Sequence, residues 1–120
     1  MQVTVNPSPN ANPVVTITVP SVSITLPTNS ATLAGTATDS DGTITGYSWS
    51  KVSGPASYSI VTVNAASTSV INLVQGTYQF VLTATDNLGA TGSGLMTVTV
   101  LPNLTPVPST SIILYNWKIN

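Results

Sequence analysis

Asp39 and Asp41 are separated by one serine and stand directly before Gly42, and this spacing is the feature of the chain best suited to chemistry. Carboxylates two positions apart in a turn suit Ca²⁺, which takes about six to eight oxygen ligands. Backbone carbonyls and Asp86 could add to such a shell. The alternative is that Asp39 and Asp41 cap the turn through hydrogen bonds from backbone N–H groups, as we expect of Asp86 and Asn87 in a later turn. Calcium is therefore the one cofactor that the sequence leaves open.

We expect no catalysis, because the side chains that enzymes use most are missing. The chain has no His and no Cys, and only three acidic and two basic residues. A serine nucleophile would have no imidazole base, and Lys51 and Lys118 lie far apart in the sequence. Glycoside hydrolysis would need a carboxylate pair in a substrate cleft, which a small filled domain rarely offers. Zinc sites of the common types are excluded as well.

The composition limits the partners. Charged residues make up 4% of the chain, against about 25% in typical proteins. The scarcity of basic residues excludes nucleic acid and anionic lipid, and no apolar run approaches the roughly 20 residues of a membrane span. With 20 Thr and 15 Ser, the surface is either kept soluble by its hydroxyls or largely buried in an assembly.

Short β-strands must position the acidic turn, since Gly, Pro and Asn recur at short intervals and no helical periodicity is present. The N-terminus lacks the basic head and apolar run of a signal peptide, so we expect a mature piece, an excised piece or a protein exported by another route. Pro20 splits the first strand and confines it to a sheet edge or a kink. The expected strands are 14–19, 22–26, 31–38, 44–50, 58–63, 69–73, 77–85 and 94–100. The sequence predicts an all-β, two-sheet antiparallel sandwich.

Three aromatic residues are predicted to lie in the core of this sandwich. Trp49 stands in a central strand, like the buried tryptophan of immunoglobulin-like domains. Tyr78 follows Gly76-Thr77 at the start of a late strand, where a tyrosine-corner hydroxyl bonds nearby backbone. Phe80 shares the face of Tyr78 in the clearest alternation of the chain. We do not expect Trp49 or Tyr78 to serve as an exposed sugar-stacking platform.

The stretch from Asn12 to Val100 resembles a polycystic-kidney-disease-type (PKD) domain, an immunoglobulin-like β-sandwich. The matching pieces are Asn12-Pro13, LPTNSATLAGTATDSDGTITGYSWSKVSGP from Leu26 to Pro55, LVQGTYQFVLTATDNLGATGS from Leu73 to Ser93, and the closing MTVTV. The resemblance implies a spacer, adhesion or polysaccharide-associated module of secreted or surface proteins, and not an enzyme. An acid common in the first strand of the family is missing here, which weakens the case for calcium.

A short repeat divides the chain into three parts. Met96 to Pro102 matches Met1 to Pro7 in five of seven positions, at an offset of 95 residues. Each copy leads into a linker rich in Pro, Asn and Ser and then into an apolar segment, which indicates descent from a tandem array. We therefore expect an N-terminal arm at 1–11, the sandwich at 12–102 and a C-terminal arm at 103–120.

The two arms are the better clue to function. They carry apolar, β-prone residues that could complete the open edge of a neighbouring sheet, and the expected interface residues are Val3, Val5, Ile112, Ile113, Leu114, Tyr115 and Trp117. The sequence favours a self-associating structural or adhesion module of a surface fibre, filament or virion decoration. It would be a homo-oligomer or a neighbour of like repeats, located outside the cell, on the cell surface or on a virion. The alternative is a polysaccharide-binding or spacer module, with Tyr58, Tyr115 and Trp117 as candidate contacts.

Overall fold

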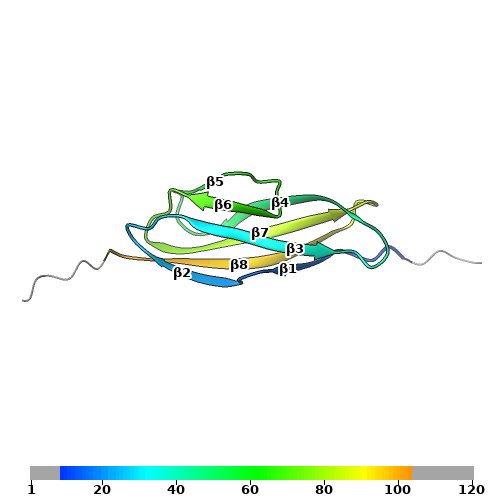
Figure 1. Ribbon diagram of the computed structural model, residues 1–120, viewed down its shortest axis with the longest axis horizontal. Helices are drawn as coiled ribbons and strands as arrows, with labels where there is room; N and C mark the ends of the chain where they lie inside the picture. The colour runs from blue at the N-terminus through cyan, green and yellow to red at the C-terminus, as the bar shows by residue number, and fades with distance from the viewer. Residues whose placement is uncertain (1–8, 104–120) are drawn as a thin grey trace, which may run out of the picture.

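The computed structural model describes residues 9–103, and these residues form two four-stranded sheets packed face to face (Figure 1). One sheet has the order β1-β3-β6-β5 and the other β2-β8-β7-β4. The strands are β1 (Val14–Ile17), β2 (Ser21–Thr25), β3 (Ala31–Thr38), β4 (Ile44–Ser53), β5 (Ser59–Ile60), β6 (Ser67–Ile71), β7 (Gly76–Asp86) and β8 (Thr91–Leu101). The predicted all-β sandwich is confirmed.

The first strand is split between the two sheets, as Pro20 predicts. Before the proline, β1 pairs with β3 in antiparallel fashion. After it, the chain crosses to the other sheet and keeps its direction, so β2 runs parallel to β8. This is the one parallel pair among the described strands, and all the others are antiparallel.

The core lies between the sheets and is built on alternate residues of β7. Its inward-facing side chains are fully buried because residues two apart share one face of a strand; they are Tyr78, Phe80, Leu82 and Ala84. The rings of Tyr78 and Phe80 are stacked with centroids 5.8 Å apart. Trp49 of β4 is 2% exposed and completes this layer. All three aromatic residues predicted for the core are found there. The prediction that Trp49 stands in a central strand is wrong, because β4 is the edge strand of its sheet.

Tyr78 also forms the predicted tyrosine corner. Its hydroxyl donates to the backbone oxygen of Ser57 at 2.6 Å and accepts from the backbone N–H of Val74 at 3.0 Å. Two loops are thereby fastened to the start of β7. A buried hydroxyl of this kind needs such partners, because leaving a polar group unpaired in the core is costly.

The strand expected at 58–63 is wrong in length, since β5 contains only Ser59 and Ile60. Val61 and Thr62 still donate backbone N–H groups to Ser69 and Thr68 of β6, each at 2.9 Å. The chain then reaches β4, where the N–H of Trp49 donates to the oxygen of Val63 at 2.7 Å. The strand expected at 69–73 begins and ends earlier, at Ser67 and Ile71. It stops there because Asn72 has a φ of 61°, outside the extended region.

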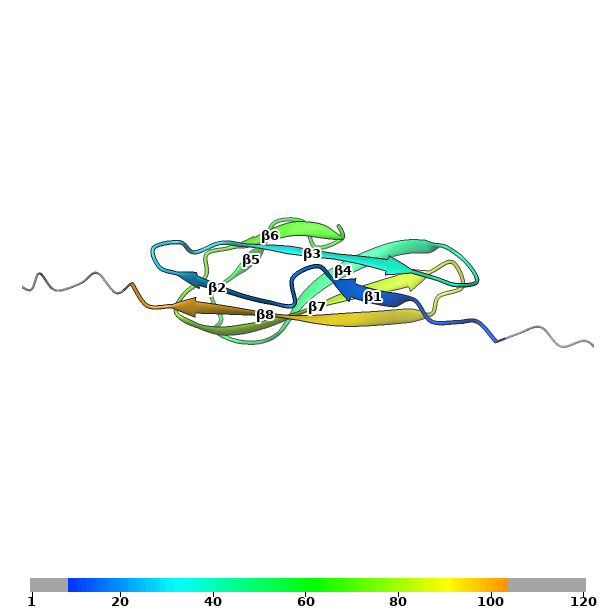
Figure 2. The same ribbon diagram turned by 60° about the horizontal axis from the view of Figure 1, so that its bottom comes forward.

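The chain enters and leaves the sandwich at opposite ends (Figures 1 and 2). Residues 9–13 lie at the same end as the β3–β4 and β7–β8 turns, and this end is called the acidic end below. β8 finishes at the other end, called the C-terminal end, beside the end of β2, where Thr25 is paired with Leu101. No helix in the described part of the chain is long and apolar enough to cross a membrane.

Candidate metal centre

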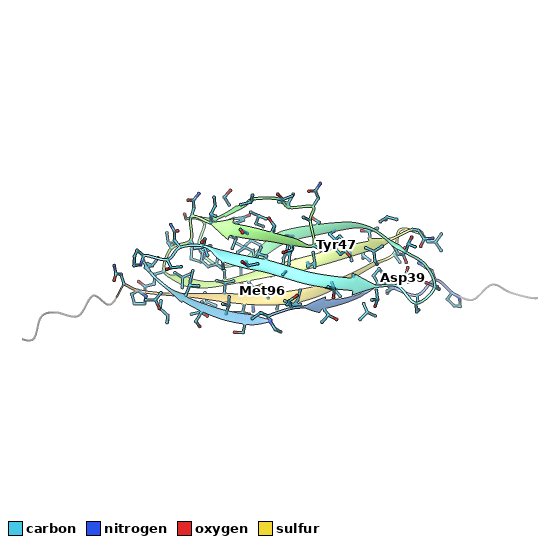
Figure 3. The ribbon with its side chains drawn as sticks, in the orientation of Figure 1. Asp39, Tyr47 and Met96 are labelled. Carbon is cyan, nitrogen blue, oxygen red and sulfur yellow. The ribbon has the colours of Figure 1, made fainter. Side chains whose placement is uncertain are left out.

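Three carboxylates meet at the acidic end of the sandwich. Asp39 and Asp41 come from the β3–β4 turn, and Asp86 is the last residue of β7. One oxygen from each lies within 4.8 Å of the others. Figure 3 shows Asp39 at this end, close to where the chain enters. The two turns meet because Ile44, the first residue of β4, is paired with Asp86.

Asp86 is held as an anion by three hydrogen bonds. Oδ1 accepts from the backbone N–H groups of Leu88 and Ala90, each at 2.9 Å, and Oδ2 accepts from Nδ2 of Asn10 at 2.8 Å. Burial, with only 2% of the residue exposed, acts to raise its pKa. The bonds from Asn10, Leu88 and Ala90 outweigh that effect and hold the pKa below its ordinary value. Asp86 thus caps its own turn, as the sequence predicts.

Residues 10 and 11, where the chain enters the sandwich, are hydrogen-bonded to the acidic cluster. Besides the bond from Asn10 to Asp86, the backbone N–H of Ala11 donates to Oδ2 of Asp41 at 2.8 Å. Asp41 therefore binds the linker, 30 residues away in sequence. The bond considered from the sequence was a different one, in which Asp41 caps its own turn. Asn10 is a member of the cluster that the sequence analysis misses.

Three buried oxygens of the cluster have no hydrogen-bond partner. Both carboxylate oxygens of Asp39 and Oδ1 of Asn10 are buried without a hydrogen bond of acceptable geometry. Burial raises the pKa of Asp39 to about 6, and the Asp41 carboxyl group adds to that rise, while the Asp41 backbone N–H opposes it. Buried acceptors normally have donors. The three unpartnered oxygens therefore leave a place for a positively charged group beside them.

The donor set fits a hard cation. It offers both Asp39 oxygens, the amide oxygen of Asn10, and the Asp41 and Asp86 carboxylates, all of which are oxygen ligands of the kind that Ca²⁺ takes. The three carboxylates, with oxygens within 4.8 Å of one another, also supply the negative charge that attracts a cation. Gly42 fits tightly here, because an added Cβ would collide with Oδ1 of Asn87.

The single described lysine takes no part in this cluster. Nζ of Lys51 donates to the backbone oxygens of Gly54 at 3.2 Å and Pro55 at 2.7 Å, and it lies 4.7 Å from the centre of the Tyr58 ring. Lys51 therefore fixes a loop. Tyr58 is 37% exposed, and one side of it packs against Phe80 at 6.1 Å. Residues 9–103 enclose no pocket.

The predicted interface residues cannot be placed. All seven lie outside the described residues, and so do two of the three aromatic residues considered for sugar binding; the residues concerned are Val3, Val5, Ile112, Ile113, Leu114, Tyr115 and Trp117. Their role stays a prediction.

Comparison with known proteins gives one family. Residues 18–100 match the model described as "K319L-like, PKD domain". No curated protein matches the chain. Among solved structures, the PKD domain of the KIAA 1837 protein is 29% identical with a TM-score of 0.66, over 85% of this chain and 98% of that one.

Two further solved structures share the fold at lower identity. The PKD domain of human KIAA0319 is 24% identical with a TM-score of 0.68, covering 89% of this chain and 96% of that one. The PKD1 domain of Vibrio anguillarum Epp is 23% identical with a TM-score of 0.58, covering 78% and 99%. The likeness therefore extends over whole domains.

Proposed function

The chain belongs to the PKD-domain family, and on that premise we propose that it is a non-catalytic structural module that joins like modules end to end. PKD domains are typically extracellular or surface modules without catalytic activity. The observation that carries the proposal is that the chain enters and leaves at opposite ends of the sandwich (Figure 2). Modules connected through such ends extend a row, whereas termini at one end would fold it back.

The surface of the sandwich supports association with copies of itself. Among the described residues, the charged side chains are the three aspartates at the acidic end and Lys51. The outer faces of both sheets are made of Ser, Thr, Val and other neutral residues, so copies that approach one another meet little repulsion between like charges. In this proposal the apolar arms, residues 1–11 and 103–120, provide the contacts between neighbours in a surface fibre, filament or virion decoration.

A second function concerns the acidic end, where we propose that Ca²⁺ binds between Asp39, Asp41, Asp86 and Asn10. The unpartnered buried oxygens of Asp39 and Asn10 favour it. When bound, the ion supplies the positive charge that these oxygens lack. Because Asn10 and Ala11 already bond to the cluster, the ion would also fix the linker to the turn and stiffen the module where it follows its neighbour.

Polysaccharide binding is the alternative partner function. Only one aromatic ring of the described residues, Tyr58, is exposed enough to stack on a sugar, and sugar-binding surfaces ordinarily use more than one. Retention on insoluble glycans that is lost in Tyr58→Ala would favour this alternative.

The test of end-to-end association is analytical ultracentrifugation of three chains: residues 1–120, a variant lacking 1–8 and a variant lacking 104–120. The full chain should form species larger than a monomer at high concentration, and each truncation should reduce them. Circular dichroism and thermal melting verify that the truncated chains keep the sandwich. A full chain that sediments as a monomer at all concentrations contradicts the proposal.

A further inference from the structure

Within residues 9–103, no strand pairs with the outer edge of β2. The N–H of Thr97 donates to the oxygen of Pro20 at 2.8 Å, and the N–H of Leu26 donates to the oxygen of Leu101 at 3.0 Å. Alternate residues of a parallel strand bond to its neighbour, so Val22 and Ile24 also face β8. The backbone groups of the residues between them point the other way; these residues are Ser21, Ser23 and Thr25.

Little of the described chain covers this edge. β2 is the last strand of its sheet, and Ser21 and Ser23 are exposed. The oxygen of Thr25 accepts from the N–H of Thr28 at 3.0 Å, which closes only the end of the edge. No charged residue lies between Pro20 and Pro27, although charges and prolines are what normally protect exposed edges.

The other strand edges are better covered. The edge of β4 is bonded by Val63 through the N–H of Trp49, and β5 has only two residues. β1 packs against β8. A Cβ added at Gly94 of β8 would lie about 3.0 Å from side-chain atoms of Val15 and Ile17, so no side chain fits there. Among the described edge strands, β2 is therefore the one of five or more residues that has no charged residue and no hydrogen bond to another strand on its outer side before Thr25.

We propose that the outer edge of β2 accepts residues 111–117 of a second copy of this chain as an added strand. This inference rests on the proposed self-association and names its acceptor surface. The segment reads SIILYNW and has no charge and no proline, which suits main-chain pairing with apolar side chains placed against the sheet. Its seven residues match the five of β2 with a residue to spare at either end.

The position of the C-terminal arm favours a second copy over the same chain. The arm leaves at Leu101, directly beside the end of β2. Pro102, Pro106 and Pro108 favour an extended linker of about 3.1 Å per residue, which would carry segment 111–117 away from its own sandwich. To reach the outer edge of its own β2, the arm would have to reverse direction and pass the end of β2 (Thr25), which the extended conformation favoured by the prolines opposes.

Cysteine cross-linking tests the pairing directly, because the chain has no cysteine of its own. One protein carries Ser23→Cys, and five others carry a single cysteine at 112, 113, 114, 115 or 116. Each of the five is mixed with the first and oxidised. The yield of covalent dimer should alternate along the five positions, because successive residues of a strand point to opposite faces. Ser50→Cys, exposed on the other edge strand β4 of the same sheet, is the matched control.

A second variant tests the backbone of the edge. Ser23→Pro removes an N–H that points away from β8 and leaves the bonds of Val22 and Ile24 in place. We expect the dissociation constant of self-association to rise at least about ten-fold, the equivalent of roughly one lost backbone hydrogen bond, while the melting temperature changes little.

The outcomes separate the two proposals. Equal yields at all five positions, or yields no higher than with Ser50→Cys, overturn β2 as the acceptor, and association by ultracentrifugation then still upholds end-to-end assembly. Cross-linking within a single chain that carries both cysteines at high dilution overturns the second copy as the donor. A native chain that never associates overturns the acceptor and the proposed function together.

Discussion

Calcium should raise the melting temperature of this domain, and the size of the rise follows from the donor set. The cluster offers few carboxylate oxygens that are not already hydrogen-bonded, so water must complete the shell and the affinity should be that of weak extracellular sites, with a Kd of about 10⁻⁴–10⁻³ M. At about 10 mM Ca²⁺, binding with this affinity stabilises the folded state by about 1.4–2.7 kcal/mol. For a domain of this length the melting temperature should rise by about 6–20 °C.

The assay is differential scanning calorimetry in Ca²⁺, in EDTA and in NaCl of matched ionic strength, at pH 7.5. Asp39→Asn is the critical variant, because it keeps the size of the side chain and removes one buried charge. Without calcium it should melt at or above the temperature of the native chain, since the like charges of Asp41 and Asp86 no longer oppose it. It should also lose most of the response to Ca²⁺.

Two results would refute the reasoning. One is a melting temperature that is the same in EDTA and in Ca²⁺, because an ion that binds only the folded state must stabilise it. The other is a full calcium response in Asp39→Asn, which would move the ion elsewhere. Lys51→Gln serves as the control, since Lys51 is bonded to Gly54 and Pro55 and takes no part in the cluster.

Three further outcomes are expected. The pKa of Asp39 is raised to about 6 in the folded state, so its contribution to the stability of the calcium-free chain is present below about pH 4 and is lost as the pH rises through 6. Urea titrations at several pH values measure this pH dependence of the free energy of unfolding. Asp39→Asn should flatten it. Tyr78→Phe should cost about 1–3 kcal/mol in the free energy of unfolding, because the partly buried backbone N–H of Val74 and C=O of Ser57 lose their partner. Gly92→Ala should cost about 1–3 kcal/mol, because its Cβ would collide with the backbone oxygen of Pro13; Gly46→Ala, with no atom near its Cβ, should change stability by less than about 1 kcal/mol.

The sequence predicted the elements whose pattern is local. The alternation from Tyr78 to Ala84 placed the inner face of β7, and Pro20 placed the division of the first strand. The predictions that failed concern segments whose structure is set by contacts with distant parts of the chain. In the expected strand 58–63, bonding to β6 continues only as far as Thr62, and Val63 accepts a hydrogen bond from Trp49 of β4. Nothing in the residues near Ile60 signals that bond to a distant strand.

The acidic cluster shows the same limit. The pair Asp39 and Asp41 could be recognised from its spacing, and Asp86 from its turn. Asn10 could not, because its bond to Asp86 spans 76 residues and an asparagine in a linker has no distinguishing pattern. The buried oxygens without partners, which favour a cation, are buried because three separate segments of the chain meet around them. The spacing of residues in the sequence does not reveal such a meeting.

The two ends of the sandwich are built differently, and this difference bears on how modules would connect. At the acidic end, hydrogen bonds from Asn10 and Ala11 fix the incoming chain to the same carboxylates that would bind calcium. At the C-terminal end the chain leaves through a proline-rich linker, beside the open edge of β2. A cation would therefore stiffen the junction on one side of each module, while the strand contact on the other side would set the association with the next copy. Chelation should then change the bending of an assembled row more than the association of its subunits, which electron microscopy and ultracentrifugation of the same sample distinguish.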